Sequence, residues 1–207
     1  MQEGAGQERA GTVFIVDDDE RVLRSLQRLL KLSGYAVTPF ADARSLLGCA
    51  ELATAECIVL DLGLPDTDGL GVQEALSTID GHPSVVFLTG RADVPSSVRA
   101  MKAGAVDFLM KPVEEAALLV AIEAGVQRTR GEREADQQKA RVQARLESLT
   151  AREAEVLQHV VAGRLNKQIA GDLGTVEKTI KVHRARMMAK MGVRTVADLV
   201  RLVEYGR

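Results

Sequence analysis

Carboxylates, a hydroxyl and an ammonium occur in this chain directly after short apolar segments. An aspartate run at 17–19 follows TVFIV, Asp61 follows CIVL, Thr89 follows SVVFL, and Lys111 comes shortly after VDFL. Carboxylates gathered in one place cannot all stay ionised without a cation, and ligands that are all oxygen suit a hard ion such as Mg²⁺. With a carboxylate nucleophile and a lysine to neutralise charge on the transferring group, these side chains could carry out phosphoryl transfer.

A second group of residues with its own chemistry lies between positions 177 and 191. Ile180, Met187 and Met191 repeat at helical spacing, which predicts one buried face. The opposite face is basic, and a helix of this kind fits the major groove of DNA, where Lys reaches guanine acceptors and Val touches a thymine methyl. The residues predicted to contact DNA on this ground are Lys167, Lys178, Lys181, Val182, Arg184 and Arg186. A solvated basic helix with no nucleic-acid partner is the alternative.

The acidic and polar residues need a parallel sheet to bring them together. Apolar runs predict five strands, at Thr12–Val16, Tyr35–Pro39, Cys57–Leu60, Ser84–Leu88 and Val106–Leu109. Segments with helical periodicity lie between them, so right-handed crossovers and a doubly wound five-stranded parallel α/β sheet are expected. Ligands bind such sheets at the carboxyl ends of the strands, where the acidic residues lie. Asp19 and Glu20 are predicted to mark the N-terminus of the first helix.

The chain is predicted to contain two domains and a linker. The first domain covers residues 1–127, with its core at 10–127; a highly charged helical linker, 128–148, continues its fifth helix. Val142, Leu146 and Leu149 form a short apolar seam near the end of this stretch, which belongs either to a pairing helix or to a solvated spacer. The third part, 149–207, is predicted to be all-α.

Four helices are predicted in this last part, at 151–162, 167–173, 175–191 and 196–204. The side chains expected to begin them are Thr150 with Glu153, Asn166, Thr175 or Glu177, and Thr195 with Asp198. The tight turn at Gly174 between the second and third helices is typical of a helix-turn-helix.

The net charge of the whole chain, -2, hides an uneven distribution. Residues 1–127 carry 10 basic and 19 acidic side chains, whereas residues 150–207 carry 11 and 6. Such asymmetry indicates two modules with different partners. With no apolar run near 18 residues and only Cys49 and Cys57, the chain is expected to be cytoplasmic, with no membrane partner and no disulfide framework. The low aromatic content argues against binding of single-stranded nucleic acid.

The motifs IVDDDE, VLDLGLPDTDG, FLTG, MKAGAVDFL and KP, in this order and spacing, resemble those of response-regulator receiver domains of bacterial two-component systems. The stretch TGRADVPSSVRAMKAGAVDFLMKP is similar to the FixJ-type subgroup, and the resemblance covers residues 11–127. It implies a CheY-like fold in which Asp61 accepts a phosphoryl group from a sensor histidine kinase. It also implies a Mg²⁺ ion held by Asp17, Asp18, Asp61 and the backbone carbonyl of Gly63.

The same resemblance implies that Thr89 and Lys111 bind phosphoryl oxygens, that Phe108 is the aromatic switch, and that the peptide bond after Lys111 is cis. Two positions depart from the usual pattern of this subgroup. Gly63 offers no side chain, and Arg91 replaces a more frequent His. Both flank the expected path of a water that attacks the phosphoryl group, so the sequence predicts no lifetime for the phosphorylated state.

The stretch LTAREAEVLQHVVAGRLNKQIAGDLG, followed by KTIKVHRARMMAKMGVRT, resembles the LuxR-type helix-turn-helix of FixJ and NarL regulators over residues 149–204. Lys181 and Val182 fall where that family reads DNA, and Thr179 and His183 lie beside them. His183 is either a phosphate contact or a partly buried packing residue. Val176 stands where the family usually has a capping Ser, so the residue before it is expected to take over the cap.

Together, the two resemblances imply a phosphorylation-dependent transcriptional regulator rather than an enzyme. Phosphorylation would reshape the surface around the fourth helix and fifth strand, and the resulting homodimer would bind two-fold promoter DNA. One alternative is a DNA-binding regulator whose receiver is a phosphorylation-independent interaction domain. A second is a Mg²⁺-dependent phosphatase with an aspartyl nucleophile, for which Asp17-x-Asp19 has suitable spacing.

Overall fold

The computed structural model describes residues 10–65, 67–90 and 94–206. The chain divides into two compact units, one up to residue 133 and one from residue 134 onward. A single long helix, α5 (Glu115–Glu147), contributes residues to both, as the predicted helical continuation requires. Within the described residues, no helix is long and apolar enough to cross a membrane.

The N-terminal unit is built on five parallel strands in the order β2-β1-β3-β4-β5. They are β1 (Thr12–Val16), β2 (Ala36–Phe40), β3 (Cys57–Leu60), β4 (Ser84–Thr89) and β5 (Asp107–Met110). Every predicted strand is present, with ends that differ by at most one residue. Val16 pairs with Leu60, and Leu60 with Phe87, so the carboxyl ends of β1, β3 and β4 lie next to one another.

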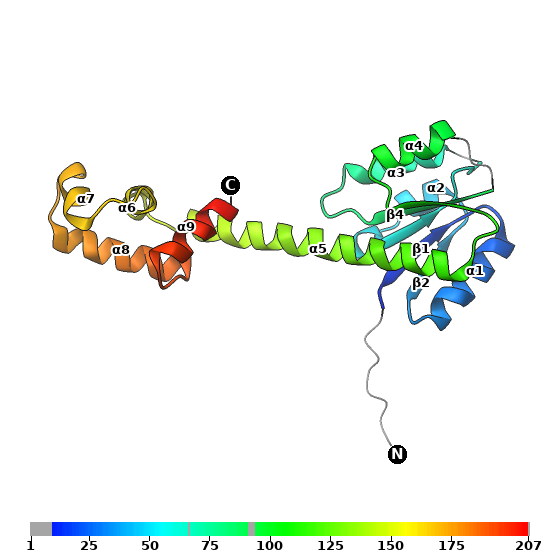
Figure 1. The fold of residues 1–207 in the computed structure, drawn as a ribbon, viewed down its shortest axis with the longest axis horizontal. Helices are drawn as coiled ribbons and strands as arrows, with labels where there is room; N and C mark the ends of the chain where they lie inside the picture. Colours follow the sequence, from blue (N-terminus) through cyan, green and yellow to red (C-terminus); the bar gives the residue numbers. More distant parts are fainter. Residues whose placement is uncertain (1–9, 66, 91–93, 207) are drawn as a thin grey trace, which may run out of the picture. The chain divides into compact units, whose positions relative to one another are not determined.

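Helices cover both faces of this sheet, as a doubly wound fold requires (Figure 1). The helices that precede α5 are α1 (Glu20–Leu32), α2 (Ala43–Leu47), α3 (Gly69–Ser77) and α4 (Val94–Lys102), with a short 3₁₀ turn at Leu52–Thr54. Apolar residues of α1 and α5 form one core with alternate strand residues such as Val13 and Ile15. Residues of α2, α3 and α4 form the other core, around Phe14 and Phe87.

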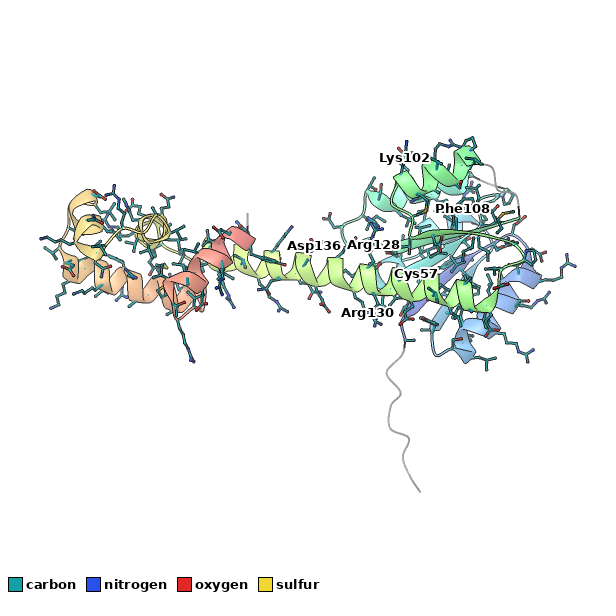
Figure 2. The ribbon with its side chains drawn as sticks, in the orientation of Figure 1. Cys57, Lys102, Phe108, Arg128, Arg130 and Asp136 are labelled. Carbon is teal, nitrogen blue, oxygen red and sulfur yellow. The ribbon has the colours of Figure 1, made fainter. Side chains whose placement is uncertain are left out.

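Several residues of α5 beyond position 127 form hydrogen bonds near the N-terminal ends of strands in the N-terminal unit. The fully buried Thr129 hydroxyl accepts a hydrogen bond from the Ser84 N–H at the start of β4 (2.9 Å). Arg130 pairs with Glu56 just before β3 (2.6 Å), and Arg133 donates to the carbonyl of Ala55 (2.7 Å). Figure 2 labels Arg130, which projects from the part of α5 that lies along the sheet. These contacts hold this part of α5 at the edge opposite the acidic residues.

The C-terminal unit is all-α, as predicted. It contains the end of α5 with α6 (Ala151–Val161), α7 (Asn166–Asp172), α8 (Glu177–Met191) and α9 (Val196–Tyr205), whose apolar faces share one core. Val142 of α5 is 1% exposed, and a side chain on Gly206 would collide with it. Leu146 and Leu149 pack against the core of the same unit. The apolar seam therefore packs within the C-terminal unit, so the solvated-spacer alternative is wrong for these residues.

Two predicted helix starts are borne out, one of them in part. Thr150 and Glu153 form a capping box at α6, in which each side chain accepts a hydrogen bond from the other residue's backbone N–H. Thr195 caps α9 by accepting from the Asp198 N–H (3.1 Å). The Asp198 carboxylate accepts from the Thr195 hydroxyl (2.6 Å) rather than from its backbone, so the second predicted capping box is only half present.

Two other predicted caps are wrong. Asn166 is the first residue of α7, and the backbone N–H before it is bound by Gln168 (2.9 Å). The Asn166 side chain instead accepts a hydrogen bond from Arg184 on α8 (2.9 Å), a tertiary partner that helical spacing does not reveal. α8 begins at Glu177, one of its two predicted first residues, but its N-cap position is held by Val176, which makes no capping hydrogen bond, and Thr175 does not take over the cap.

Candidate functional site

The sheet brings three aspartates together at the carboxyl ends of β1 and β3. One carboxylate oxygen from each of Asp17, Asp18 and Asp61 lies within 4.8 Å of the others. Asp17 is 2% exposed and Asp61 is 9% exposed, whereas Asp18 faces solvent. Asp19 is used differently, because its side chain caps α1 by accepting from the Arg21 N–H (2.8 Å), as predicted for a helix-start residue.

Lys111, just after β5, joins two of these carboxylates. Its ammonium donates hydrogen bonds to Asp17 and to Asp61 Oδ2, the latter at 3.0 Å. Burial raises the pKa of the Asp17 carboxyl above its ordinary value although the Lys111 ammonium opposes this. Burial acts to lower the pKa of Lys111, but its hydrogen bonds to both carboxylates outweigh that effect and raise it. Lys111 is therefore held in its charged form.

The formal charge of this cluster suits a divalent cation. Three carboxylates and one ammonium carry a total of -2 when all are ionised. Burial already disfavours the charged form of Asp17, so an added divalent cation would relieve a cost that Lys111 only partly offsets. All the side-chain donors are carboxylate oxygens, which are ligands that Mg²⁺ prefers.

Thr89 and Phe108 lie on the strands beside this cluster. Thr89 ends β4, is 2% exposed, and accepts the Lys111 backbone N–H on its carbonyl (2.8 Å). Phe108, labelled in Figure 2, lies on β5 and is half-buried. Its ring centroid lies 5.9 Å from that of Phe87. The predicted cis bond between Lys111 and Pro112 is present.

The two atypical positions differ in what can be said of them. The Gly63 backbone N–H donates to Asp61 Oδ1 (3.3 Å), and a side chain at Gly63 would meet no atom within 4 Å. This residue therefore leaves open space beside the cluster without any steric need for glycine. Arg91 lies outside the described residues.

The basic face of the C-terminal unit lies mainly on α8. Ile180, Met187 and Met191 are fully buried, which confirms the predicted core stripe. Lys167 on α7 and Lys178, Lys181, Val182 and Arg186 on α8 are exposed, and Thr179, His183 and Arg184 are partly exposed. All the residues predicted to contact DNA are thus at least partly open to solvent.

Contacts that the sequence analysis missed hold α8 in place. Lys190, near its C-terminus, donates to the Glu153 carboxylate on α6 (2.6 Å). This bond, together with the Thr150 N–H, lowers the pKa of Glu153 to about 2. Near the other end, Arg184 binds Asn166 of α7 as described above. Both partners are far away along the chain, so no local pattern could have revealed them.

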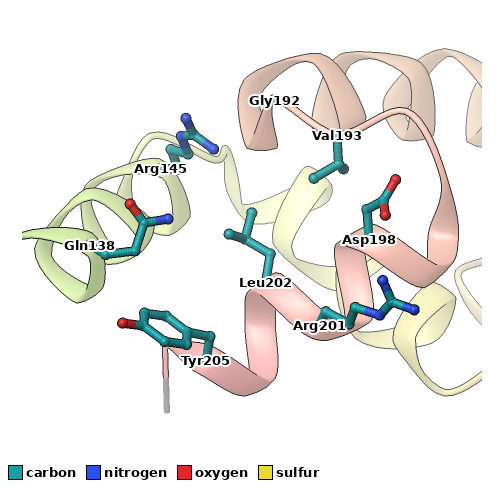
Figure 3. A pocket seen from close by; sticks show the side chains of 8 residues that line it. All are labelled: Gln138, Arg145, Gly192, Val193, Asp198, Arg201, Leu202 and Tyr205. Carbon is teal, nitrogen blue, oxygen red and sulfur yellow. The ribbon is translucent and has the colours of Figure 1, made fainter. Parts of the chain in front are cut away.

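A shallow hollow of about 500 Å³ lies elsewhere in the same unit, beside α9 (Figure 3). Its lining residues are Gln138, Arg145, Gly192, Val193, Asp198, Arg201, Leu202 and Tyr205. Arg145 donates to the carbonyl of Met191 at the end of α8 (2.9 Å). None of the residues predicted to contact DNA lines this hollow.

Comparisons with known proteins agree with this geometry. A family model described as the response regulator receiver domain matches residues 13–123, and one for bacterial regulatory proteins of the luxR family matches residues 147–203. Nodulation protein W of Bradyrhizobium diazoefficiens is 42% identical over 93% of this chain and 85% of its own length. Transcriptional regulatory protein FixJ of Rhizobium meliloti is 41% identical over 94% of this chain and 96% of its own. The structure of the response regulator StyR covers 93% of this chain and 98% of its own, with 47% identity and a TM-score of 0.86.

Fold and site therefore define a receiver domain followed by a LuxR-type helix-turn-helix domain. The chain belongs to the FixJ-related transcriptional response regulators of two-component systems. Its function is phosphorylation-dependent regulation of transcription, and it is not a classical enzyme. Receiver domains typically bind Mg²⁺ in an acidic pocket, and the cluster around Asp61 is such a pocket.

Proposed function

We propose that Asp61 is the residue that accepts the phosphoryl group from a sensor histidine kinase. The observation that carries this assignment is the hydrogen bond between the Lys111 ammonium and Asp61 Oδ2, next to two further carboxylates. An Asp61 oxygen attacks phosphorus, a P–O bond forms, and the P–N bond to the kinase histidine breaks. Lys111 then pairs with a phosphoryl oxygen, and the buried Thr89 hydroxyl binds another.

Asp17, Asp18 and Asp61, with the backbone carbonyl of Gly63, are the proposed Mg²⁺ ligands. When bound, the ion would offset negative charge on the phosphoryl oxygens. The charge of -2 on the cluster and the all-oxygen donor set support this assignment. No enzymatic turnover is expected beyond slow loss of the protein's own phosphoryl group.

Phosphorylation is proposed to act through Thr89 and Phe108 on the surface of α4 and β5. Apolar side chains are exposed there, including Val98 (44%), Met101 (47%) and Met110 (57%). Thr89 moves toward the phosphoryl group, Phe108 rotates, and two copies of the reshaped surface form a homodimer. The exposed apolar residues support this step, since such patches commonly mark interaction sites.

The C-terminal unit is proposed to bind double-stranded promoter DNA. Lys181 and Val182 contact base edges in the major groove, with Lys178 and Thr179 beside them. Lys167, Arg184 and Arg186 contact phosphates, and His183 lies at this edge. The proposed location of the protein is the cytoplasm, where it would meet both a kinase and chromosomal DNA.

The proposed division of the chain is a receiver core at 10–127, a helical linker at 128–148 and a DNA-binding domain at 149–207.

The phosphatase alternative is not supported. It would need Asp19 in the acidic pocket, whereas this carboxylate caps α1 and is paired with Arg21. The phosphorylation-independent alternative assigns no role to the carboxylates that are hydrogen-bonded to Lys111.

The test is Asp61→Asn in the full-length protein, with Asp42→Asn as control, because Asp42 is a partly exposed aspartate that caps α2, where an asparagine can also cap. With a labelled acyl phosphate and Mg²⁺, the control should incorporate label like the wild type and gain dimer and DNA affinity. Asp61→Asn should do neither. Wild-type labelling of Asp61→Asn would disprove the acceptor assignment, and labelling without any change in DNA affinity would favour the phosphorylation-independent alternative.

A further inference from the structure

The first turn of α8 carries one carboxylate among basic residues. Glu177 is the only acidic side chain of α8, which also contains three lysines and two arginines. Its Oε1 lies 3.1 Å from the Nζ of Lys181, one turn further along the helix. The side chains are 46% and 63% exposed, so both are open to a ligand on the outer surface of the helix.

Helix stability explains only part of this arrangement. An acidic residue in the first turn favours the positive end of the helix dipole, and α8 has no side-chain cap at Val176. The dipole does not require the carboxylate to pair with Lys181, which is a proposed base-reading residue. An exposed pair of this kind adds little to stability, so its consequence is to hold an acceptor and a donor side by side.

This acceptor and donor match the major-groove edge of one particular base pair. In a C·G pair, cytosine N4 is a donor and guanine O6 an acceptor, and they lie about 2.9 Å apart because they hydrogen-bond to each other. The carboxylate and ammonium of Glu177 and Lys181 have nearly the same separation with the opposite roles. Lys181 keeps further N–H donors that can reach guanine N7.

An A·T pair offers a poorer match. Adenine N6 is a donor next to thymine O4, but adenine N7 is a second acceptor that would repel the Glu177 carboxylate. Lys181 would lose its second acceptor and face the thymine methyl instead. Glutamate accepting from cytosine and lysine donating to guanine are both favoured pairings in DNA recognition.

We propose that Glu177 is a specificity-determining residue, which with Lys181 reads one C·G base pair in each half-site. The inference rests on the proposed contact of α8 with the major groove. The N-terminal residues of a recognition helix are those that reach base edges in this type of motif, which places Glu177 at the correct end.

The experiment is selection of bound sequences from a random double-stranded DNA pool by the full-length protein with Mg²⁺ and beryllofluoride. The wild type should select a half-site containing an invariant C·G pair. Glu177→Ala and Lys181→Ala should lose that preference and retain the rest of the site. Glu177→Gln should shift the preference to adenine, because an amide can bind N6 and N7 together.

Glu155→Gln is the matched control, because it removes a carboxylate that is also paired along a helix, with Arg152 on α6 (2.8 Å). This variant should select the wild-type site. On defined duplexes, replacing the C·G pair by T·A should weaken wild-type binding about tenfold. The same replacement should change binding of Glu177→Ala less than twofold, while its affinity for unrelated DNA should equal or exceed that of the wild type.

The outcomes separate this inference from the function on which it rests. If the wild type selects no sequence and binds no DNA, the proposed DNA contact of α8 fails. If the wild type selects a site and Glu177→Ala selects the same site with equal stringency at every position, Glu177 is not a specificity residue.

Discussion

The receiver pocket and the outer face of α8 use charged side chains in opposite ways. In the pocket, Asp17 and Thr89 are each 2% exposed and Lys111 is bonded to two carboxylates at once. On α8, the Lys181 side chain is 63% exposed and its partner is an exposed carboxylate. Buried charges depend strongly on one another, whereas exposed charges are screened by water and salt. One substitution should therefore disable the pocket, but only weaken the DNA-binding face.

The receiver and the C-terminal unit also differ in how a lysine acts on a buried carboxylate. Asp17 and Glu153 both accept a hydrogen bond from a lysine. For Asp17, burial prevails and the pKa is raised. For Glu153, the hydrogen bond from Lys190 prevails and the pKa falls to about 2. Both carboxylates are almost fully buried, so the direction of each shift also depends on the other partners: the like charge of Asp61 acts on Asp17, whereas Glu153 accepts further hydrogen bonds from Thr150.

The largest effect is expected from Lys111→Met. Without its ammonium, the pocket loses the contact that joins Asp17 to Asp61 and the group that would bind a phosphoryl oxygen. The gain in DNA affinity on phosphorylation, about 5- to 150-fold if coupling between the sites is of ordinary size, should disappear. Binding to an operator duplex with and without beryllofluoride measures it. Lys31→Met, at the exposed end of α1, is the control. A full gain in DNA affinity for Lys111→Met would show that the pocket does not need the Lys111 ammonium.

A smaller effect is expected from Glu153→Gln, and it should depend on pH. The folded pKa of about 2 lies below the ordinary 4.5, so the ionised carboxylate contributes stability above pH 4.5 that is lost as the pH falls toward 2. The C-terminal unit of the variant should be less stable than that of the wild type at pH 7, and the difference should shrink as the pH falls. Hydrogen exchange in α6 and α8, corrected for intrinsic exchange, follows this difference. A difference that stays constant from pH 7 to pH 3 would contradict the role of Lys190.

The smallest effect is expected from Lys167→Gln. This exposed lysine near the start of α7 is a proposed phosphate contact, so its loss should weaken binding to all duplexes by a similar, few-fold factor. The slope of affinity against salt concentration should fall by about one. Titrations at several salt concentrations with operator and unrelated duplexes provide the measurement. A change in sequence preference instead would mean that Lys167 reads bases. Phosphate-contacting and base-reading residues would then not be separate on this exposed face.

Much of the fold could be predicted from the sequence because the signals are local. Short apolar runs marked all five strands to within one residue, and the spacing of Ile180, Met187 and Met191 identified the buried face of α8. The acidic cluster was predictable because strand ends of a parallel sheet share one edge. Local reasoning failed where a tertiary partner competed for a side chain. Asn166 has the chemistry of a cap, but Arg184 takes its oxygen.

The sequence by itself determined which side chains follow the strands, which face of α8 is polar, and how acidic and basic residues divide between the two ends of the chain. Only the tertiary structure decided that Lys111 joins Asp17 to Asp61 and that Lys190 binds Glu153. It also decided that Arg130 and Thr129 form hydrogen bonds near the N-terminal ends of β3 and β4. The physical reason is distance along the chain. Periodicity and turn signals report on neighbouring residues, whereas these contacts join residues 37 to 94 positions apart, which only the packing of whole elements brings within hydrogen-bonding distance.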